Sequence, residues 1–410
     1  MPENKNDSVY SPSGKFSSHI LDVFTKSNAL VSVAVVVLGF LIGTIIIIAV
    51  GRNPGGMYSA LLQNLTGFSV HPRTGDWVWN PRNIGEWIAS SLPLILTGLS
   101  MGFAARTGIF NIGAEGQYIV GITAAQFVAF YFPPIPGLHI SMAVAAAVLA
   151  GATWGGIVGY LKARFKVSEV VATIMMNFIA LYLSRYLTML IPGSSTFRTP
   201  DYAESVMLTN NFFISITNHS RLNNGLFLVI AAIICYWLLM EKTRLGYSLR
   251  ATGLNKEAAR YGGISVNASM TTAMAVAGAF AGLAGAVVAL GSFSHGRVLS
   301  GFDGFGFDGI AVALVGNSNA WGIALAGLLF GMLRSAQPLM QSRQIPMEIS
   351  VIIMGTIVVL ISLRFGVKLL MEWQMKEKAR KGQSAIHVTP SAGADTGAAG
   401  TQAGKGAEHD

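Results

Sequence analysis

The feature that most constrains this chain is a series of long apolar segments separated by short polar ones. The first segment, 29–50, is almost unbroken in Val, Leu and Ile, and a helix of about 20 apolar residues crosses the hydrocarbon core of a bilayer. Further apolar segments follow at 84–105, 114–132, 139–161, 168–191, 225–240, 267–292, 306–316, 320–334 and 347–367. These segments predict an all-α, polytopic membrane protein with about ten transmembrane helices.

The composition agrees with a membrane protein and argues against a soluble enzyme. Of the 410 residues, 52% are hydrophobic and 11% are charged, whereas about a quarter of the residues of a soluble domain are charged. The 47 glycines suit helices that pack closely in lipid. The formal net charge is +9, but the basic residues fall between the apolar segments, where anionic lipid headgroups account for them. We therefore expect the lipid bilayer, and no nucleic acid, as a partner.

The distribution of Lys and Arg predicts the orientation in the membrane. If the N-terminus is cytoplasmic, 19 of these residues fall on the cytoplasmic side and 8 on the opposite side, and cytoplasmic loops are the ones that carry the excess of positive charge. Both termini are then cytoplasmic. We expect a polar N-terminal tail at 1–28, a transmembrane domain at 29–367 and a cytoplasmic, largely disordered tail at 368–410, whose side chains are too polar to form a core.

A long cytoplasmic loop, 241–266, contains the pattern of a short helix. Asn255 can cap the helix at its start, 256–260 continue it, and Gly262 and Gly263 end it. Its charged and small residues offer a surface to a soluble partner. The alternative is a solvated linker with a single helical turn.

Polar residues inside the apolar segments are candidates for a transport path. Asn111 and Glu115 are spaced by one helical turn and, with Gln117, lie where the segment 114–132 begins. Asn177 lies among Met and Phe side chains, a setting that suits a nucleobase but equally core packing. Polar groups at such depth need a partner or a wet cavity. The alternative is that these residues hold helices together by hydrogen bonds or cap a helix end.

A glycine-rich segment, 301–309, carries Asp303 and Asp308. A calcium site is poorly supported, because no further carboxylates lie nearby in the sequence. We favour a flexible, re-entrant turn near 301–319, in which Asp308 either caps the next helix or faces the path. The segments 306–316 and 320–334 form either two helices or one broken, re-entrant element, because Asn317, Ser318 and Asn319 interrupt them. Irregular backbone at membrane depth requires a protein or water lining.

The glycine-rich segment also takes part in a weak internal likeness. Residues 110–121 and 305–316 each run from an aromatic residue through Gly and an acidic residue to an apolar Val-Gly end. Duplicated halves are common in transporters. We therefore consider an internal repeat as a hypothesis.

Signatures of catalysis and of nucleotide binding are absent from the sequence. It contains no HExxH, GxSxG or GxxxxGK[ST] motif and no His or Cys cluster with metal-ligand spacing. We expect no catalytic residues, no metal site and no cofactor bound by this chain. We therefore expect that this chain is not an enzyme.

The loop 241–266 resembles a motif of a known family. Glu257, Ala258 and Ala259, followed by Gly262 or Gly263, are similar to the coupling loop of ATP-binding cassette (ABC) importer permeases. In that family the short helix sits in a groove of the ATPase subunit. The resemblance implies that these residues, with Asn255, couple the chain to an ATPase.

Three longer segments strengthen the resemblance. FNIGAEGQ at 110–117, EVVATIMMNFIALYL at 169–183 and GFGFDGIAVALVG at 304–316 are similar to permeases of nucleoside or simple-sugar ABC importers. These belong to the branched-chain amino acid and ribose permease superfamily, and their importers are associated with lipoproteins of the basic membrane protein class. The similarity covers about 84–367.

The resemblance implies a set of partners and a location. It implies a separate ATPase subunit on the cytoplasmic side, which binds ATP and Mg²⁺. It also implies a second permease chain, commonly a different one, that pairs with this chain in the membrane, and a substrate-binding lipoprotein outside the membrane. The location implied is the cytoplasmic membrane. The amino-acid sequences of the segments are closer to those of nucleoside permeases, which favours nucleosides as the substrate. Two alternatives stay open: a permease for ribose-like sugars, and an ion-coupled secondary transporter, for which Glu115 and Asp308 are the candidate carboxylates.

Overall fold

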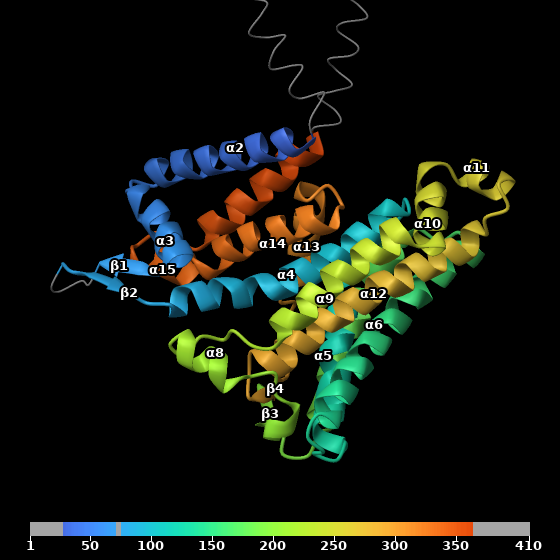
Figure 1. The fold of residues 1–410 in the computed structure, drawn as a ribbon, viewed down its shortest axis with the longest axis horizontal. Helices are drawn as coiled ribbons and strands as arrows, with labels where there is room; N and C mark the ends of the chain where they lie inside the picture. Colours follow the sequence, from blue (N-terminus) through green and yellow to red (C-terminus); the bar gives the residue numbers. More distant parts are fainter. Residues whose placement is uncertain (1–27, 71–74, 364–410) are drawn as a thin grey trace, which may run out of the picture. The chain divides into compact units, whose positions relative to one another are not determined.

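The structure is a computed structural model that describes residues 28–70 and 75–363, and these residues are mostly helical (Figure 1). The predicted N-terminal tail, 1–28, except for its last residue, the predicted C-terminal tail, 368–410, and the end of the last apolar segment lie outside the described residues. The division into tails and a transmembrane domain therefore stays a prediction.

Seven described helical segments are long and apolar enough to cross a bilayer. They are α2 (Asn28–Ala49), α4 (Arg82–Arg106), α6 (Leu138–Phe165), α7 (Glu169–Met189), α9 (Gly225–Trp237) with its π-helical extension η2 (Leu238–Lys242), α12 (Val266–Gly291), and α14 (Ala320–Ser335) followed by α15 (Gln337–Ser342). The all-α, polytopic prediction is therefore confirmed.

The predicted count of ten is not confirmed. The remaining three apolar segments also form helices, α5 (Ala114–Tyr131), α13 (Phe305–Val315) and Glu348–Leu363. However, α13 has 11 residues, about 16 Å at 1.5 Å per residue, which is half the thickness of the hydrocarbon core. A short apolar helix in the interior is therefore not by itself evidence of a crossing.

Small residues allow the central helices to approach closely. A Cβ atom added to Gly278 of α12 would lie 2.1 Å from the carbonyl oxygen of Gly151 in α6, and one added to Gly282 would lie 2.3 Å from the carbonyl oxygen of Ala147. No larger side chain fits without movement of the backbone. This close packing is the use of glycine that the composition predicts.

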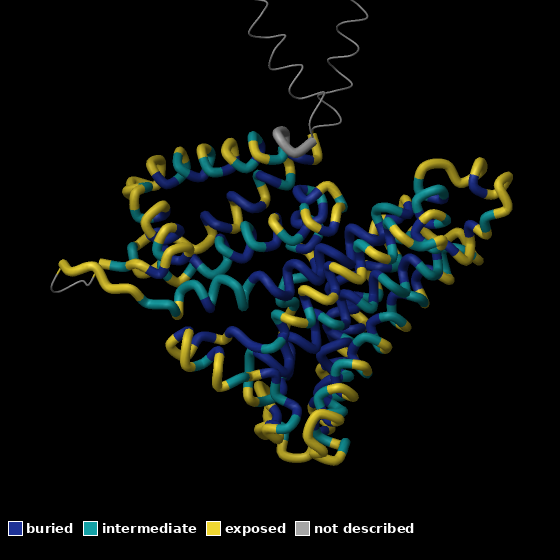
Figure 2. Tube along the Cα trace, viewed as in Figure 1, coloured by how far each residue is buried: buried dark blue, intermediate teal, exposed yellow. Residues whose placement is uncertain are grey.

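Two sets of three helices pack in a reciprocal manner. Helix α4 contacts α13 and α14, helix α12 contacts α5 and α6, and α4 and α12 contact each other. The set α4–α5–α6 therefore corresponds to the set α12–α13–α14, which agrees with the hypothesis of an internal repeat. The buried residues are concentrated along α4, α5 and α12, where the two sets meet (Figure 2).

Shorter elements lie in the connecting segments at the ends of the long helices. A helix, α3 (Gly55–Thr66), leads into the antiparallel hairpin of β1 (Phe68–Val70) and β2 (Trp77–Trp79). The other segments are β3 (Arg198–Asp201), which pairs with β4 (His295–Arg297), η1 (Glu204–Val206) and α8 (Asn211–Ile216). After β4 the chain returns to the interior, where Thr97, in the middle of α4, donates a hydrogen bond to the carbonyl oxygen of Phe305 at 2.8 Å.

Candidate functional site

A helical hairpin projects at the end of the protein where α4 finishes (Figure 1). It consists of α10 (Arg244–Leu254) and α11 (Lys256–Tyr261). The Asn255 side chain accepts hydrogen bonds from the backbone NH groups of Glu257 and Ala258, both at 3.0 Å. The helix ends at Gly262, and Gly263 has a φ of +80°. The short helix predicted in this loop, with its cap and its stop, is confirmed, whereas its coupling role stays a prediction.

Most of the α11 surface is free for contact. The side chain of Glu257 is 77% exposed, and Leu254 and Tyr261 are 89% and 98% exposed. Only the small side chain of Ala259 is buried, in a cluster with residues of α12. Exposed apolar side chains on a projecting helix are typical of a surface that binds another protein.

The hairpin is fixed to the end of α4 and is not a flexible linker. Glu241, in η2, forms ion pairs with Arg106 of α4, at 2.6 Å, and with Arg250 of α10. A Cβ atom added to Gly253 would lie 2.3 Å from the carbonyl oxygen of Arg106. The two backbones are therefore in direct contact.

A second group of predicted residues lies buried in the protein. Asn111 donates hydrogen bonds to Gln117 at 3.0 Å and to Ser100 at 3.2 Å, and Gln117 donates back to Asn111 at 3.2 Å. Asn177 accepts a hydrogen bond from the NH group of Gly116 at 2.8 Å and donates to the carbonyl oxygen of Ile112 at 3.1 Å. These amides hold the start of α5 against α4 and α7. This is the structural role that the sequence left open as the alternative to a role in the transport path.

The expected one-turn relation between Asn111 and Glu115 is wrong. Helix α5 begins at Ala114, so Asn111 lies before the helix and the two side chains do not share a helical face. The side chain of Asn111 instead accepts a hydrogen bond from the NH group of Gly113 at 3.1 Å. Such local bonds of an Asn side chain compete with helix formation, which explains why the helix does not extend back to Asn111.

Glu115 connects α5 to the start of α13. Its carboxylate oxygens accept hydrogen bonds from the NH groups of Gly304, at 2.8 Å, and Gly306, at 2.6 Å, and the residue has no exposed surface. The first NH groups of a helix have no partner within the helix and carry partial positive charge. Glu115 therefore satisfies the buried beginning of α13, a helix-capping role of the kind considered as the alternative.

Asp308 does not cap α13, contrary to one of the two expectations. It lies inside the helix and forms an ion pair with Arg334 at 2.7 Å, and Arg334 also donates to the carbonyl oxygen of Asp303 at 2.7 Å. Asp303 in turn accepts hydrogen bonds from Arg297, at 2.7 and 2.8 Å, and from the Tyr118 hydroxyl at 2.8 Å. Both acids of the glycine-rich segment are therefore paired with guanidinium groups.

Sequence reasoning missed the partners of these acids. Arg297 and Arg334 were counted only as loop charges that indicate topology, and Tyr118 was not singled out. A signal was available, because an acid within an apolar segment needs a base close to it and both arginines flank short apolar segments. The distance in the sequence, 26 residues between Asp308 and Arg334, hid the pairing.

Cavities lie on both sides of the segment that begins α13. One of about 340 Å³ is lined mainly by polar residues, namely Asp303, Asp308, Arg334, Gln337, Met347, Glu348, Val351 and Met354. A smaller one of about 130 Å³ is lined by ten residues that include Ser90, Arg221, Ser292, Arg297 and, again, Asp303. The two cavities therefore share Asp303 in their walls.

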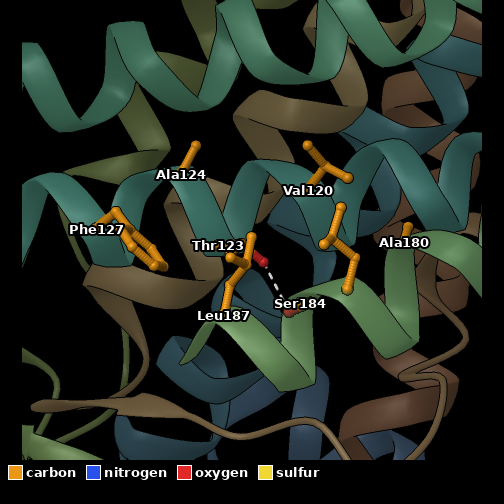
Figure 3. Close-up of a pocket in the computed structure, with 8 residues that line it drawn as sticks. Val120, Thr123, Ala124, Phe127, Ala180, Ser184 and Leu187 are labelled. Carbon is orange, nitrogen blue, oxygen red and sulfur yellow. Dashed lines mark hydrogen bonds between the residues drawn. The ribbon is translucent and has the colours of Figure 1, made fainter. Parts of the chain in front are cut away.

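A third cavity, between α5 and α7, is apolar. It has a volume of about 190 Å³, and the hydroxyl of Thr123 on its wall donates to that of Ser184 at 2.6 Å (Figure 3). Both hydroxyl groups are engaged with each other. This cavity has little to offer a polar solute.

The fold and these sites define a polytopic helical membrane protein with an ion-paired interior and an exposed helical hairpin at one end. Residues 83–362 match the model of a known family, described as "Branched-chain amino acid transport system / permease component". The chain belongs to this family of transporter permease components. It is a multi-pass protein of the cytoplasmic membrane.

The similarity to individual permeases extends over most of the chain. The guanosine ABC transporter permease protein NupP of Bacillus subtilis is 38% identical over 346 residues, which cover 84% of this chain and 96% of the relative. The nucleoside ABC transporter permease protein NupB of Lactococcus lactis is 35% identical, over 87% of this chain and 96% of the relative. The ribose import permease protein RbsC of Escherichia coli is 26% identical, over 60% and 70%. No solved structure matches this chain. The family predicted from four short segments is confirmed.

Proposed function

We propose that this chain is the permease subunit of an ABC importer that carries nucleosides across the cytoplasmic membrane. The observation that supports it most is the similarity, along nearly their entire length, to permeases named for guanosine and for nucleosides. The ribose permease is less similar and is matched over a smaller part of both chains. Nucleosides are therefore favoured over ribose-like sugars.

The exposed hairpin is the proposed contact with the ATPase. Both termini are cytoplasmic in this proposal, so that α10 and α11 face the cytoplasm and ATP with Mg²⁺ is bound by the partner. The residues proposed to couple the two proteins are Asn255, Glu257, Ala258, Ala259, Gly262 and Gly263. Support comes from the exposure of α11 and from its rigid attachment to α4 through Glu241.

A second permease chain and a substrate-binding lipoprotein complete the proposed importer. Two relatives, NupP and NupQ, are both named as guanosine ABC transporter permeases of Bacillus subtilis, at 38% and 29% identity. Two different but related permeases in one organism support a pair of unlike chains.

The solute path in this proposal passes Asp308. Of the five residues considered for the path, Asp308 lines a polar cavity, whereas Asn111, Glu115, Gln117 and Asn177 are buried and engaged by other parts of the chain. Movement of the hairpin displaces α4, and α4 contacts α13 through Thr97. Rocking of these helices then opens the path to one side of the membrane at a time.

Uptake by cells tests the proposed function. We expect cells that lack this chain and have no redundant importer to lose uptake of labelled guanosine or uridine but not of ribose, and to regain it when the chain is restored. Unchanged nucleoside uptake would contradict the choice of substrate. Nucleoside flux through the purified chain alone in liposomes would contradict the ABC mechanism and favour an ion-coupled transporter.

A further inference from the structure

The polar cavity of about 340 Å³ has the size and lining of a small-molecule site. It lies between the start of α13, the end of α14 with α15, and the helix Glu348–Leu363. Its volume is at the lower end of the range of ligand sites, about 300–1,000 Å³. Its lining combines carboxylates, a guanidinium, an amide and apolar side chains.

One carboxylate of the cavity lacks a partner. Asp308 is paired with Arg334 and Asp303 with Arg297. Among the residues that the structure describes, Glu348 has neither a hydrogen-bond partner nor an ion-pair partner. An unpaired carboxylate accepts hydrogen bonds from hydroxyl or amino groups and repels an anion. The cavity therefore favours an uncharged solute that carries donors over a phosphorylated one.

The apolar part of the lining comes from the same segment of the chain as Glu348. Met354 is buried, and Met347 and Val351 are exposed. Unbranched, polarizable Met side chains contact aromatic rings favourably. These side chains therefore suit a flat heterocycle whose polar substituents lie near Glu348.

The mouth of the cavity is unsuited to contact with lipid. Charged groups at membrane depth, such as Asp308 and Arg334, face protein or water. The exposed stripe of the helix Glu348–Leu363 includes Val351 and Gly355, and nothing lies within 4 Å of a Cβ atom added to Gly355. A small residue on an exposed helical face permits close approach of another helix, and this face suits the second permease chain of the proposed importer.

We propose that this cavity holds the nucleoside in transit, with Glu348 accepting hydrogen bonds from the sugar hydroxyls and Met347 and Met354 contacting the base. This inference rests on the proposed function. It assigns selection for the ribose hydroxyls to the permease itself, in addition to any selection by a binding protein outside the membrane.

Comparison of a nucleoside with its 2′,3′-dideoxy analogue tests the inference. Uptake of both is measured in cells whose complete importer contains wild-type, Glu348→Ala or Glu348→Gln chains, with Glu204→Ala as the control. Glu204 is also an exposed carboxylate without a partner among the described residues, and it does not line the cavity. Selection by the binding protein affects all variants equally, so the change in the nucleoside-to-analogue ratio reports on the permease.

We expect Glu348→Ala to lower the ratio by about tenfold, the effect of losing a hydrogen bond to a charged group, and Glu204→Ala to leave it unchanged. The isosteric Glu348→Gln keeps one hydrogen-bond acceptor, so we expect it to lower the nucleoside-to-analogue ratio less than Glu348→Ala does. If Glu348→Ala shows no detectable uptake, the ratio is measured with Glu348→Gln. An unchanged ratio in both Glu348 variants would overturn the inference. Absence of nucleoside uptake by the wild-type importer would instead contradict the proposed function.

Discussion

Glu115 offers the sharpest test of how the interior is held together. Replacement by Gln keeps the shape of the side chain and one acceptor oxygen but presents an NH₂ group to the second backbone donor. One of the NH groups of Gly304 and Gly306 then loses its acceptor in a buried site. We therefore expect Glu115→Gln to loosen the start of α13.

The magnitude follows from the cost of an unsatisfied donor. A buried NH group without a partner costs about 1–3 kcal/mol, and about 1.4 kcal/mol corresponds to a tenfold change in an equilibrium constant. Local opening at the start of α13 therefore becomes about fivefold to about 140-fold more frequent. Amide hydrogen exchange, measured by mass spectrometry on the solubilised protein, detects this as faster exchange in a peptide that contains Gly304 and Gly306.

The control is Glu257→Gln, at an exposed carboxylate of α11 that lies far from α13 in the sequence. We expect this variant to exchange like the wild type in the same peptide. Equal exchange in Glu115→Gln and in the wild type would refute the conclusion that Glu115 holds α13 in place.

Four further substitutions, two of them with a matched control, test the helical hairpin and the close packing. Glu257→Arg and Gly262→Trp should abolish uptake and weaken co-purification of the ATPase while the chain still inserts, because Glu257 is 77% exposed and a Cβ atom added to Gly262 would come no closer than 3.5 Å to its neighbours. Normal uptake by both variants would remove the coupling role. Asn255→Ala should destabilise α11 by about 0.5–2 kcal/mol, seen as faster amide exchange in α11, while Asn255→Asp, which also caps, should not. Gly151→Ala should lower the thermal unfolding temperature, since its Cβ atom would lie 2.3 Å from the carbonyl oxygen of Gly278. We expect a loss of stability of about 1–3 kcal/mol. The control, Gly156→Ala, should unfold near the wild-type temperature, because its Cβ atom meets only the Cβ atom of Ala275, at 3.5 Å.

The cytoplasmic loop shows what local sequence can predict. The helix at 256–261 depends on an Asn cap before it and on glycines after it, and these interactions span a few residues. The sequence therefore predicted its position closely. The ion pairs of Glu241 with Arg106 and Arg250, which attach this loop to α4, join distant residues and were not predicted.

The polar residues of the interior show the limit of the same reasoning. Their burial was foreseeable, because each lies in an apolar segment or close to the start of one, but Asn111 proved to bind its neighbours before α5 begins instead of sharing a helical face with Glu115. A polar side chain at membrane depth must find a partner. Which partner it finds depends on the packing of the helices around it.

By itself, the sequence determined the all-helical, membrane-spanning class, the family and the short hairpin helix, because hydrophobicity, capping and stop signals act over one or two helical turns. Only the tertiary structure decided that α13 begins inside the protein, where Glu115, 189 residues away from Gly304, binds its first NH groups. It also decided that Asp303 and Asp308 are paired and that Glu348 has no partner among the described residues. The physical reason is that a buried charge or an open helix end is satisfied by whichever group the fold brings within hydrogen-bond distance, and that choice is not written in the local pattern.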